Sequence, residues 1–246
     1  MPFECAIATD IGQKRQQNQD NGGVYPELGL FVVADGMGGH QGGETASAMV
    51  VEIVPDHVRR AQKKNKKWNA QKVITAAIKA ASDAIYKRSQ NDHRLEGMGT
   101  TTTTILFKDD RLTIGHVGDS RCYFFRPGAI WQLTKDHSLV EENLRQGKIT
   151  REEAKTHTMK NVITRSVGFE PQVDVEVYDM PVATGDVFLV CSDGLSGLVE
   201  NDQMLKIVQD SLFKQGDLQA TVKQLVQAAN QNGGDDNITV LVVQIK

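Results

Sequence analysis

The sequence predicts an α+β fold built on packed antiparallel β-sheets that are covered by helices. Apolar segments of strand length are concentrated in the middle of the 246-residue chain, and helical stretches with one apolar face occur at intervals around them. No internal period of about 20–50 residues recurs, and no Pro- or Ser-rich linker divides the chain. We therefore expect a single domain over residues 1–246.

The first third of the chain begins with strands and continues with helices. Apolar segments predict strands near 3–9 and 29–34, followed by two helical stretches. The second stretch has apolar residues three or four positions apart, which places them on one face of a helix: Ile74, Ile78, Ala81 and Ile85.

The middle of the chain is rich in strands. Segments 100–107 and 111–117 flank the turn-like Lys108-Asp109-Asp110 and predict a hairpin. The residues after it alternate between strands and helices. The expected elements are strands at 121–125, 130–133, 173–177 and 187–191, helices near 202–213 and 217–231, and a strand at 238–245.

Composition excludes several classes of protein. The chain has 28 Lys+Arg against 31 Asp+Glu, a net charge of −3, whereas a general nucleic-acid binder is normally basic. No apolar run approaches the roughly 20 residues of a membrane helix, and the first residues lack the pattern of a signal peptide. Cys5, Cys122 and Cys191 form no C-x-x-C pair and fit neither a disulfide framework nor a thiolate metal site. We expect a cytoplasmic protein that binds neither nucleic acid nor membrane.

Aspartates stand where apolar strands begin or end. Asp35, Asp119 and Asp193 each closely follow a predicted strand, and Asp236 lies just before the last one. A single Asp-Gly pair of this kind is typical of a turn that ends a strand. Four such acids in one chain indicate more, because side chains at strand ends project from the edge of a sheet and can converge on one point.

Carboxylates that converge repel one another, and a bound divalent cation is the usual remedy. Oxygen ligands without a Cys/His cluster favour Mg²⁺ or Mn²⁺ over Zn²⁺. Glycines beside the acids, such as Gly36, Gly118 and Gly194, allow the backbone to approach a metal or a phosphate closely. The residues alone therefore predict an oxygen-lined site for Mg²⁺ or Mn²⁺.

Seven short motifs follow one another along the chain: Arg15…Asn18-Gln19-Asp20, Asp35-Gly36-Met37-Gly38-Gly39-His40, Gly99-Thr100-Thr101, Gly118-Asp119-Ser120-Arg121, Thr164-Arg165-Ser166-Val167-Gly168, Ser192-Asp193-Gly194 and Asp235-Asp236-Asn237. In this order they resemble the motifs of the metal-dependent Ser/Thr protein phosphatases, the PP2C or PPM family. The resemblance spans residues 4–245 and is to compact bacterial members.

This resemblance implies a central antiparallel β-sandwich flanked by α-helices on both faces, a four-layer α/β/β/α fold. It also implies two metal ions at one end of the sandwich. Asp35 would bridge both ions and the carbonyl of Gly36 would bind one of them. Asp193 and Asp236 would complete the pair of sites.

The resemblance extends to a more distant metal and to a flap. Asp20 would bind a metal through a water or would contact the metal ligands without binding the metal itself. Asp119 would share a third ion with Asp193, as in bacterial relatives. The segment 138–168 matches the variable flap beside the active site. Its polar sequence predicts helices at about 138–160 that open with capping boxes, Ser138…Glu141 and Thr150…Glu153.

The family's chemistry would use these groups in one step. Two metals about 3.5–4 Å apart hold a bridging water, lower its pKa and direct it at phosphorus. Arg15 is the natural group to grip two phosphoryl oxygens. The leaving oxygen needs a proton, either from a metal-bound water or from His40, while a structural role for His40 is equally open. Met37 stands where animal relatives carry a His acid, so that role does not transfer to His40 by alignment.

We therefore expect a protein-serine/threonine phosphatase, a monomer whose substrates are proteins phosphorylated by a Ser/Thr kinase. A catalytically dead phosphoprotein binder is a second hypothesis, which the retained Asp35, Asp193 and Asp236 disfavour. A phosphodiesterase or nuclease is a third, and the lack of a basic face argues against it. A cysteine phosphatase or a serine esterase is not supported, since no cysteine has Arg six residues later and no G-x-S-x-G motif occurs.

Overall fold

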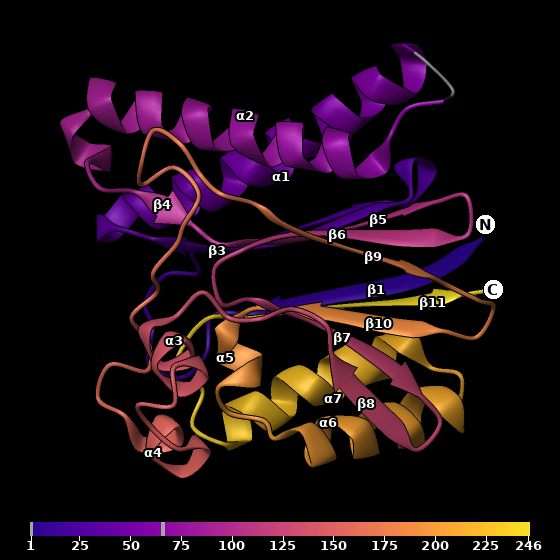
Figure 1. Cartoon of the computed structure of the whole chain (residues 1–246). Helices are drawn as coiled ribbons and strands as arrows, with labels where there is room; N and C mark the ends of the chain where they lie inside the picture. The colour runs from indigo at the N-terminus through magenta and orange to yellow at the C-terminus, as the bar shows by residue number, and fades with distance from the viewer. Residues whose placement is uncertain (1, 65–66) are drawn as a thin grey trace.

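The strands form two antiparallel sheets that pack face to face, and helices cover the outer face of each sheet (Figure 1). This computed structural model describes residues 2–64 and 67–246; the side chains of residues 40, 155 and 156 also lie outside the described part. The α+β, four-layer arrangement expected from the sequence is therefore confirmed.

Each sheet combines segments that are distant in the sequence. The first sheet runs in the order β1 (Phe3–Asp10), β11 (Ile238–Ile245), β10 (Val187–Cys191), β7 (Arg121–Arg126) and β8 (Ala129–Gln132). The second runs in the order β2 (Asp20–Tyr25), β3 (Leu30–Met37), β5 (Thr102–Lys108), β6 (Arg111–Val117) and β9 (Glu176–Pro181), with β4 (Gly99–Thr100) paired to β3.

Helices form the outer layers (Figure 1). The second sheet is covered by α1 (Gly39–Lys64) and α2 (Ala70–Asn91), and the first sheet by α6 (Asn201–Val208), a π-helical turn (Gln209–Phe213) and α7 (Leu218–Gln231). Short helices α3 (Leu139–Arg145), α4 (Arg151–Thr156) and α5 (Asp193–Ser196) lie at one end of the sandwich, and 3₁₀ turns occupy Pro26–Leu28 and His93–Leu95. In the described part of the chain, none of the helices combines the length and apolar character needed to cross a membrane.

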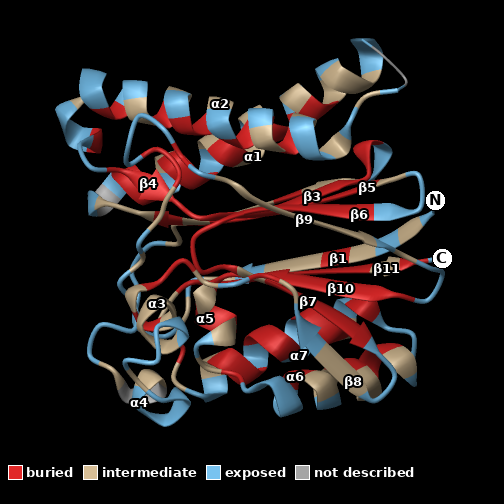
Figure 2. Cartoon of the chain, in the orientation of Figure 1, coloured by how far each residue is buried: buried red, intermediate tan, exposed pale blue. Residues whose placement is uncertain are grey.

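The alternation of side chains along β3 shows how one strand serves two cores. Phe31 and Val33 pack between the sheets, while Leu30 and Val32 pack against α1 and α2. All four are fully buried, as the red strand interiors in Figure 2 show. At about 1.5–3 kcal/mol for each large buried side chain, these layers supply the main stabilisation of the fold.

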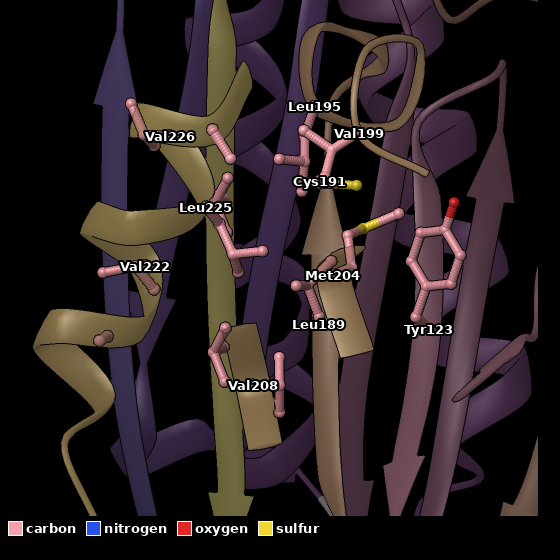
Figure 3. Packing of buried hydrophobic residues seen from close by; sticks show 14 of the residues in the cluster. Tyr123, Leu189, Cys191, Leu195, Val199, Met204, Val208, Val222, Leu225 and Val226 are labelled. Atoms are coloured by element: carbon pink, nitrogen blue, oxygen red, sulfur yellow. The ribbon is translucent and has the colours of Figure 1, made fainter. Parts of the chain in front are cut away.

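The opposite face of the sandwich is built in the same way. Leu225 and Val222 of α7 and Met204 and Val208 of α6 lie over the outer face of the first sheet (Figure 3). This face includes Leu189 of β10, which is fully buried. Two rigid outer cores therefore support the strand ends on which the predicted acids lie.

Turn and cap signals in the sequence are found in the structure. Asp109 and Asp110 both have positive φ, 50° and 57°, as the tight hairpin between β5 and β6 requires. Thr150 and Glu153 form the complete capping box of α4, and the Ser138 hydroxyl accepts from the Glu141 N–H at the start of α3.

The observed strands differ from the sequence prediction in three places. The sequence of β2 (Asp20–Tyr25) contains two glycines and had no strand signal, yet it pairs along its length with β3. The alternating segment 173–177 forms a strand only from Glu176, because β9 takes its register from β6, whose residues pair with 176–181. Asp35 lies inside β3 rather than beyond its end, because β3 continues to Met37 by pairing with β4.

Candidate active site

The topology brings aspartates from both sheets to the end of the sandwich opposite the chain termini (Figure 1). Asp20 and Asp35 are direct partners in the β2–β3 register. Asp193 follows β10 and Asp236 precedes β11, and these two strands are neighbours. Asp119 follows β6. The predicted convergence of acids from separate strands is therefore present.

Burial and mutual repulsion act on these carboxyl groups together. Burial, opposed by hydrogen bonds from Ser192 and Thr239 and aided by nearby charges, raises the pKa of Asp20 to about 7. Burial, then the charge of Asp20, raises the pKa of Asp35 well above its usual range. Burial, then the charge of Asp236, raises the pKa of Asp193 to about 6. The cluster therefore disfavours its own negative charge and favours a compensating cation.

Two carboxylate oxygens in this cluster are buried without a hydrogen-bond partner, Oδ1 of Asp20 and Oδ1 of Asp193. The other oxygen of Asp20 accepts a 2.7 Å hydrogen bond from the Ser192 hydroxyl. An unpaired buried carboxylate oxygen is costly unless it binds a ligand. Oxygen donors of this kind suit Mn²⁺ or Mg²⁺.

The described side chains include no ready-made group of three His, Cys, Asp or Glu residues that could hold a metal ion. The case for a cation therefore rests on the unpaired oxygens and on the repulsion between carboxylates, which binding would relieve.

Gly36 is fixed beside these acids by close backbone packing. A Cβ at this position would overlap the carbonyl oxygen of Gly43 in α1. The amide of Gly36 donates to the carbonyl of Gln19, 3.2 Å away, which holds the start of β2 against the end of β3. Glycine here allows α1 to begin directly over the acid cluster.

Arg15 lies on the irregular loop between β1 and β2. Its Nη2 is 2.5 Å from Oδ2 of Asp236, and its side chain is 51% exposed. An exposed guanidinium beside the acid cluster is placed to bind an anion that enters from solvent. The structure therefore brings Arg15 to the cluster.

His40 and Met37 flank the same edge. His40 lies in the first turn of α1, and its side chain is outside the described part of the structure. Met37 is the last residue of β3 and is half-buried. The proposed role of His40 as a proton donor therefore stays a prediction.

A cavity of about 330 Å³ separates the acid cluster from the 138–168 segment. Its lining includes Asp119 and Asp193 of the acid cluster and Ser138 and Lys160 of the segment. Burial, then the charge of Asp193, raises the pKa of Asp119 to about 8. Asp119 thus belongs to the acid end but faces the cavity under the segment.

Sequence reasoning missed two residues that support the acids. Ser192 is fully buried, donates to Asp20 and accepts from the Thr239 amide, 2.9 Å away. Asn237 is also buried and its side chain makes three hydrogen bonds to the loop that carries Arg15. Their signal was present, since each is a polar residue next to a predicted acid, in Ser192-Asp193-Gly194 and Asp236-Asn237.

Comparison with known proteins finds relatives over almost the whole chain. The family model described as "Protein phosphatase 2C" matches residues 11–241. The chain is 36% identical over 247 residues to the serine/threonine phosphatase stp of Listeria monocytogenes, covering 98% of this chain and 96% of the relative.

Solved structures give the same result. The serine/threonine phosphatase Stp1 from Staphylococcus aureus is 32% identical, with a TM-score of 0.90 over 100% of this chain and 96% of that one. The catalytic domain of the phosphatase PstP, solved with two manganese ions, is 33% identical, with a TM-score of 0.86 over 99% of each chain. The chain therefore belongs to the protein phosphatase 2C family.

Proposed function

We propose that this protein hydrolyses phosphoserine and phosphothreonine on proteins in a reaction that depends on Mn²⁺ or Mg²⁺. The observation that carries the proposal is the cluster of buried and half-buried aspartates, which has two buried oxygens without a partner, beside an exposed arginine. The relatives described above are named serine/threonine phosphatases, and one was solved with two manganese ions.

Five of this chain's acids and one carbonyl suit the proposed cations. Asp35 would bridge two ions, the carbonyl of Gly36 would bind one of them, and Asp193 and Asp236 would complete the pair. When bound, such ions lower the pKa of a water so that it attacks phosphorus at neutral pH. The raised pKa values of Asp35 and Asp193 support this assignment, because a cation would remove the repulsion between these carboxylates.

Asp20 and Asp119 would act outside the pair of metal sites. Asp20, held by Ser192, would orient a water or a ligand from behind the pair. Asp119, on the cavity side, would bind a third and weaker cation together with Asp193.

Arg15 would bind the phosphoryl group. Its guanidinium can donate to two oxygens of a phosphate at once, which orients the group for in-line attack and offsets its charge. The leaving serine or threonine oxygen needs a proton, and His40 or a water at the Asp119 site would supply it.

We also propose that residues 1–246 act as one domain, with 138–168 as a flap over the cavity. The protein would act as a monomer in the cytoplasm, on proteins phosphorylated by a Ser/Thr kinase. The cavity between the 138–168 segment and the acid cluster supports a substrate path there. Light scattering of the purified protein tests the monomer.

The test is the release of inorganic phosphate from a phosphothreonine peptide after dialysis against EDTA. Turnover should be abolished by EDTA and restored by Mn²⁺, with Asp35→Asn as the control for contaminating phosphatases. Full turnover in the metal-free protein, or none after Mn²⁺ is added, would contradict the proposal.

A further inference from the structure

The side chain of Asn237 is bound entirely to one loop. Its Oδ1 accepts from the amide of Gln19 at 2.8 Å, and its Nδ2 donates to the carbonyls of Ile11 and Gln17, both at 2.9 Å. The residue is only 5% exposed. All three partners are backbone groups of segment 11–19, so this one side chain holds the loop at both of its ends.

Arg15 lies between two points at which this loop is attached. On its N-terminal side, the amides of Gln13 and Lys14 both donate to the carbonyl of Gly234, at 2.7 and 3.3 Å. On its C-terminal side, the carbonyl of Gln17 accepts from Asn237. Both attachment points belong to the segment that also carries Asp236.

A second observation shows that the loop and this segment pack backbone against backbone. Gly12 has a φ of +81°, and a Cβ there would overlap the backbone oxygen of Asp236. The position needs glycine both for its conformation and for the close approach. Contacts with segment 234–237 therefore fix the position of the loop 11–19.

We propose that Asn237 is a positioning residue that sets the location of the Arg15 guanidinium relative to Asp236, and thereby the affinity for the phosphoryl group. It touches neither substrate nor metal and acts through Arg15. The inference rests on the proposed phosphatase function, in which Arg15 binds phosphate.

The first test compares Asn237→Ala with Asn232→Ala. Asn232 is a matched control, because its Nδ2 donates to Leu198 and Gln203, away from the loop. With Mn²⁺ present, Asn237→Ala should raise KM for p-nitrophenyl phosphate and Ki for inorganic phosphate by about tenfold, the effect of losing one charge-assisted hydrogen bond. Asn232→Ala should change neither, and an unchanged KM and Ki in Asn237→Ala would overturn the inference.

A double-mutant cycle separates positioning from a general loss of structure. In an Arg15→Ala background, Asn237→Ala should change KM less than about twofold, because the group through which it acts is already gone. A full tenfold effect in that background would show that Asn237 acts independently of Arg15 and would overturn the inference.

The anchoring of the loop 11–19 can also be tested by limited proteolysis, which does not depend on catalytic activity. Trypsin cuts after Lys14 and Arg15, so Asn237→Ala should be cleaved there faster than the wild type and Asn232→Ala should not. Gly12→Ala, which displaces the loop without changing Asn237, should show the same faster cleavage and the same rise in Ki. Equal cleavage rates in all variants would contradict the anchoring, whereas a wild type that releases no phosphate would contradict the proposed function alone.

Discussion

Two polar clusters of the molecule, one of histidines and one of aspartates, differ in whether their buried polar atoms have hydrogen-bond partners. In the histidine cluster, Nδ1 of His116 pairs with the Thr103 hydroxyl and Nε2 with the carbonyl of Lys135, both at 2.9 Å. His137 packs beside it, with ring centroids 4.8 Å apart, and accepts from the Gly118 amide at 3.0 Å. In the acid cluster, by contrast, Oδ1 of Asp20 and of Asp193 have no partner.

The two clusters also respond differently to burial. Burial, then the nearby His137, lowers the pKa of His116 to about 4, so the ring is neutral and its bonds are complete. Burial raises the pKa values of Asp20 and Asp193, so their negative charges cost free energy unless a cation compensates for them. The paired histidines therefore stabilise the fold, whereas the acids destabilise it until a bound ligand pairs with their oxygens.

The largest expected effect comes from removing one charge of the acid cluster. Asp35→Asn and Asp193→Asn should each lower kcat on a phosphopeptide by more than about a hundredfold, because a cation ligand is lost. The melting temperature of the EDTA-treated variants should equal or exceed that of the wild type, since repulsion is relieved. A variant that keeps most of its kcat at saturating Mn²⁺ would remove its aspartate from the proposed ligands.

Asp119→Ala should show a smaller and substrate-dependent loss. We expect it to bind two Mn²⁺ ions but lose most turnover of a phosphopeptide, whose leaving oxygen needs a proton. Turnover of p-nitrophenyl phosphate should fall less, because its leaving group needs little protonation. Calorimetric counting of bound Mn²⁺ and parallel kinetics test this, and equal losses on both substrates would contradict the leaving-group role.

Arg15→Ala should act mainly on binding. KM for a phosphopeptide should rise by about tenfold if the guanidinium binds the ground state, and kcat should fall as well if its grip tightens in the transition state. Steady-state kinetics of the variant against the wild type, at saturating Mn²⁺, measure both. An unchanged kcat/KM would show that Arg15 does not bind the phosphoryl group and that its role is limited to the ion pair with Asp236.

His116→Ala tests the histidine cluster, in which the polar atoms of the His116 ring are hydrogen-bonded. The change leaves the partners of a fully buried ring unpaired and opens a cavity, so stability should fall by about 3 kcal/mol. Urea unfolding measures the loss, and the number of Mn²⁺ ions bound by the folded variant should stay the same. A stability equal to that of the wild type would contradict the structural role of the histidine cluster.

The smallest expected effect is on the pH dependence of stability. Acids whose pKa is raised in the folded state bind more protons folded than unfolded, so stability falls as pH rises from about 4 through the folded values of about 6 to 8. The EDTA-treated protein should therefore melt several degrees lower at pH 8 than at pH 5. Mn²⁺ should raise the melting temperature more at pH 8, and an equal rise at both pH values would contradict the repulsion.

The sequence predicted the acid cluster best where an aspartate directly follows or precedes an apolar strand. Asp119, Asp193 and Asp236 flank strands whose apolar runs were evident, and the ends of these strands, which belong to both sheets, meet at one end of the sandwich. β2 could not be predicted, because Asp20-Asn21-Gly22-Gly23 has low strand propensity and is extended only by its pairing with β3.

The residues that hold the site in place could not be predicted from the sequence. Asn237 and the loop 11–19 are more than 200 positions apart, and no periodicity connects them. The role of Ser192 also depends on a contact across the sheets, with Asp20. Local patterns locate charged groups at strand ends, but the partners that hold those groups are set by tertiary packing.

Titration of Mn²⁺ into the metal-free protein, followed by calorimetry at pH 7.5, tests the central claim most directly. If the unpaired oxygens of Asp20 and Asp193 mark a cation site, the wild type should bind two ions tightly and release protons as it does so. Asp35→Asn should lose this binding, while His116→Ala should keep it. No binding by the wild type, or equal binding by wild type and Asp35→Asn, would contradict the account.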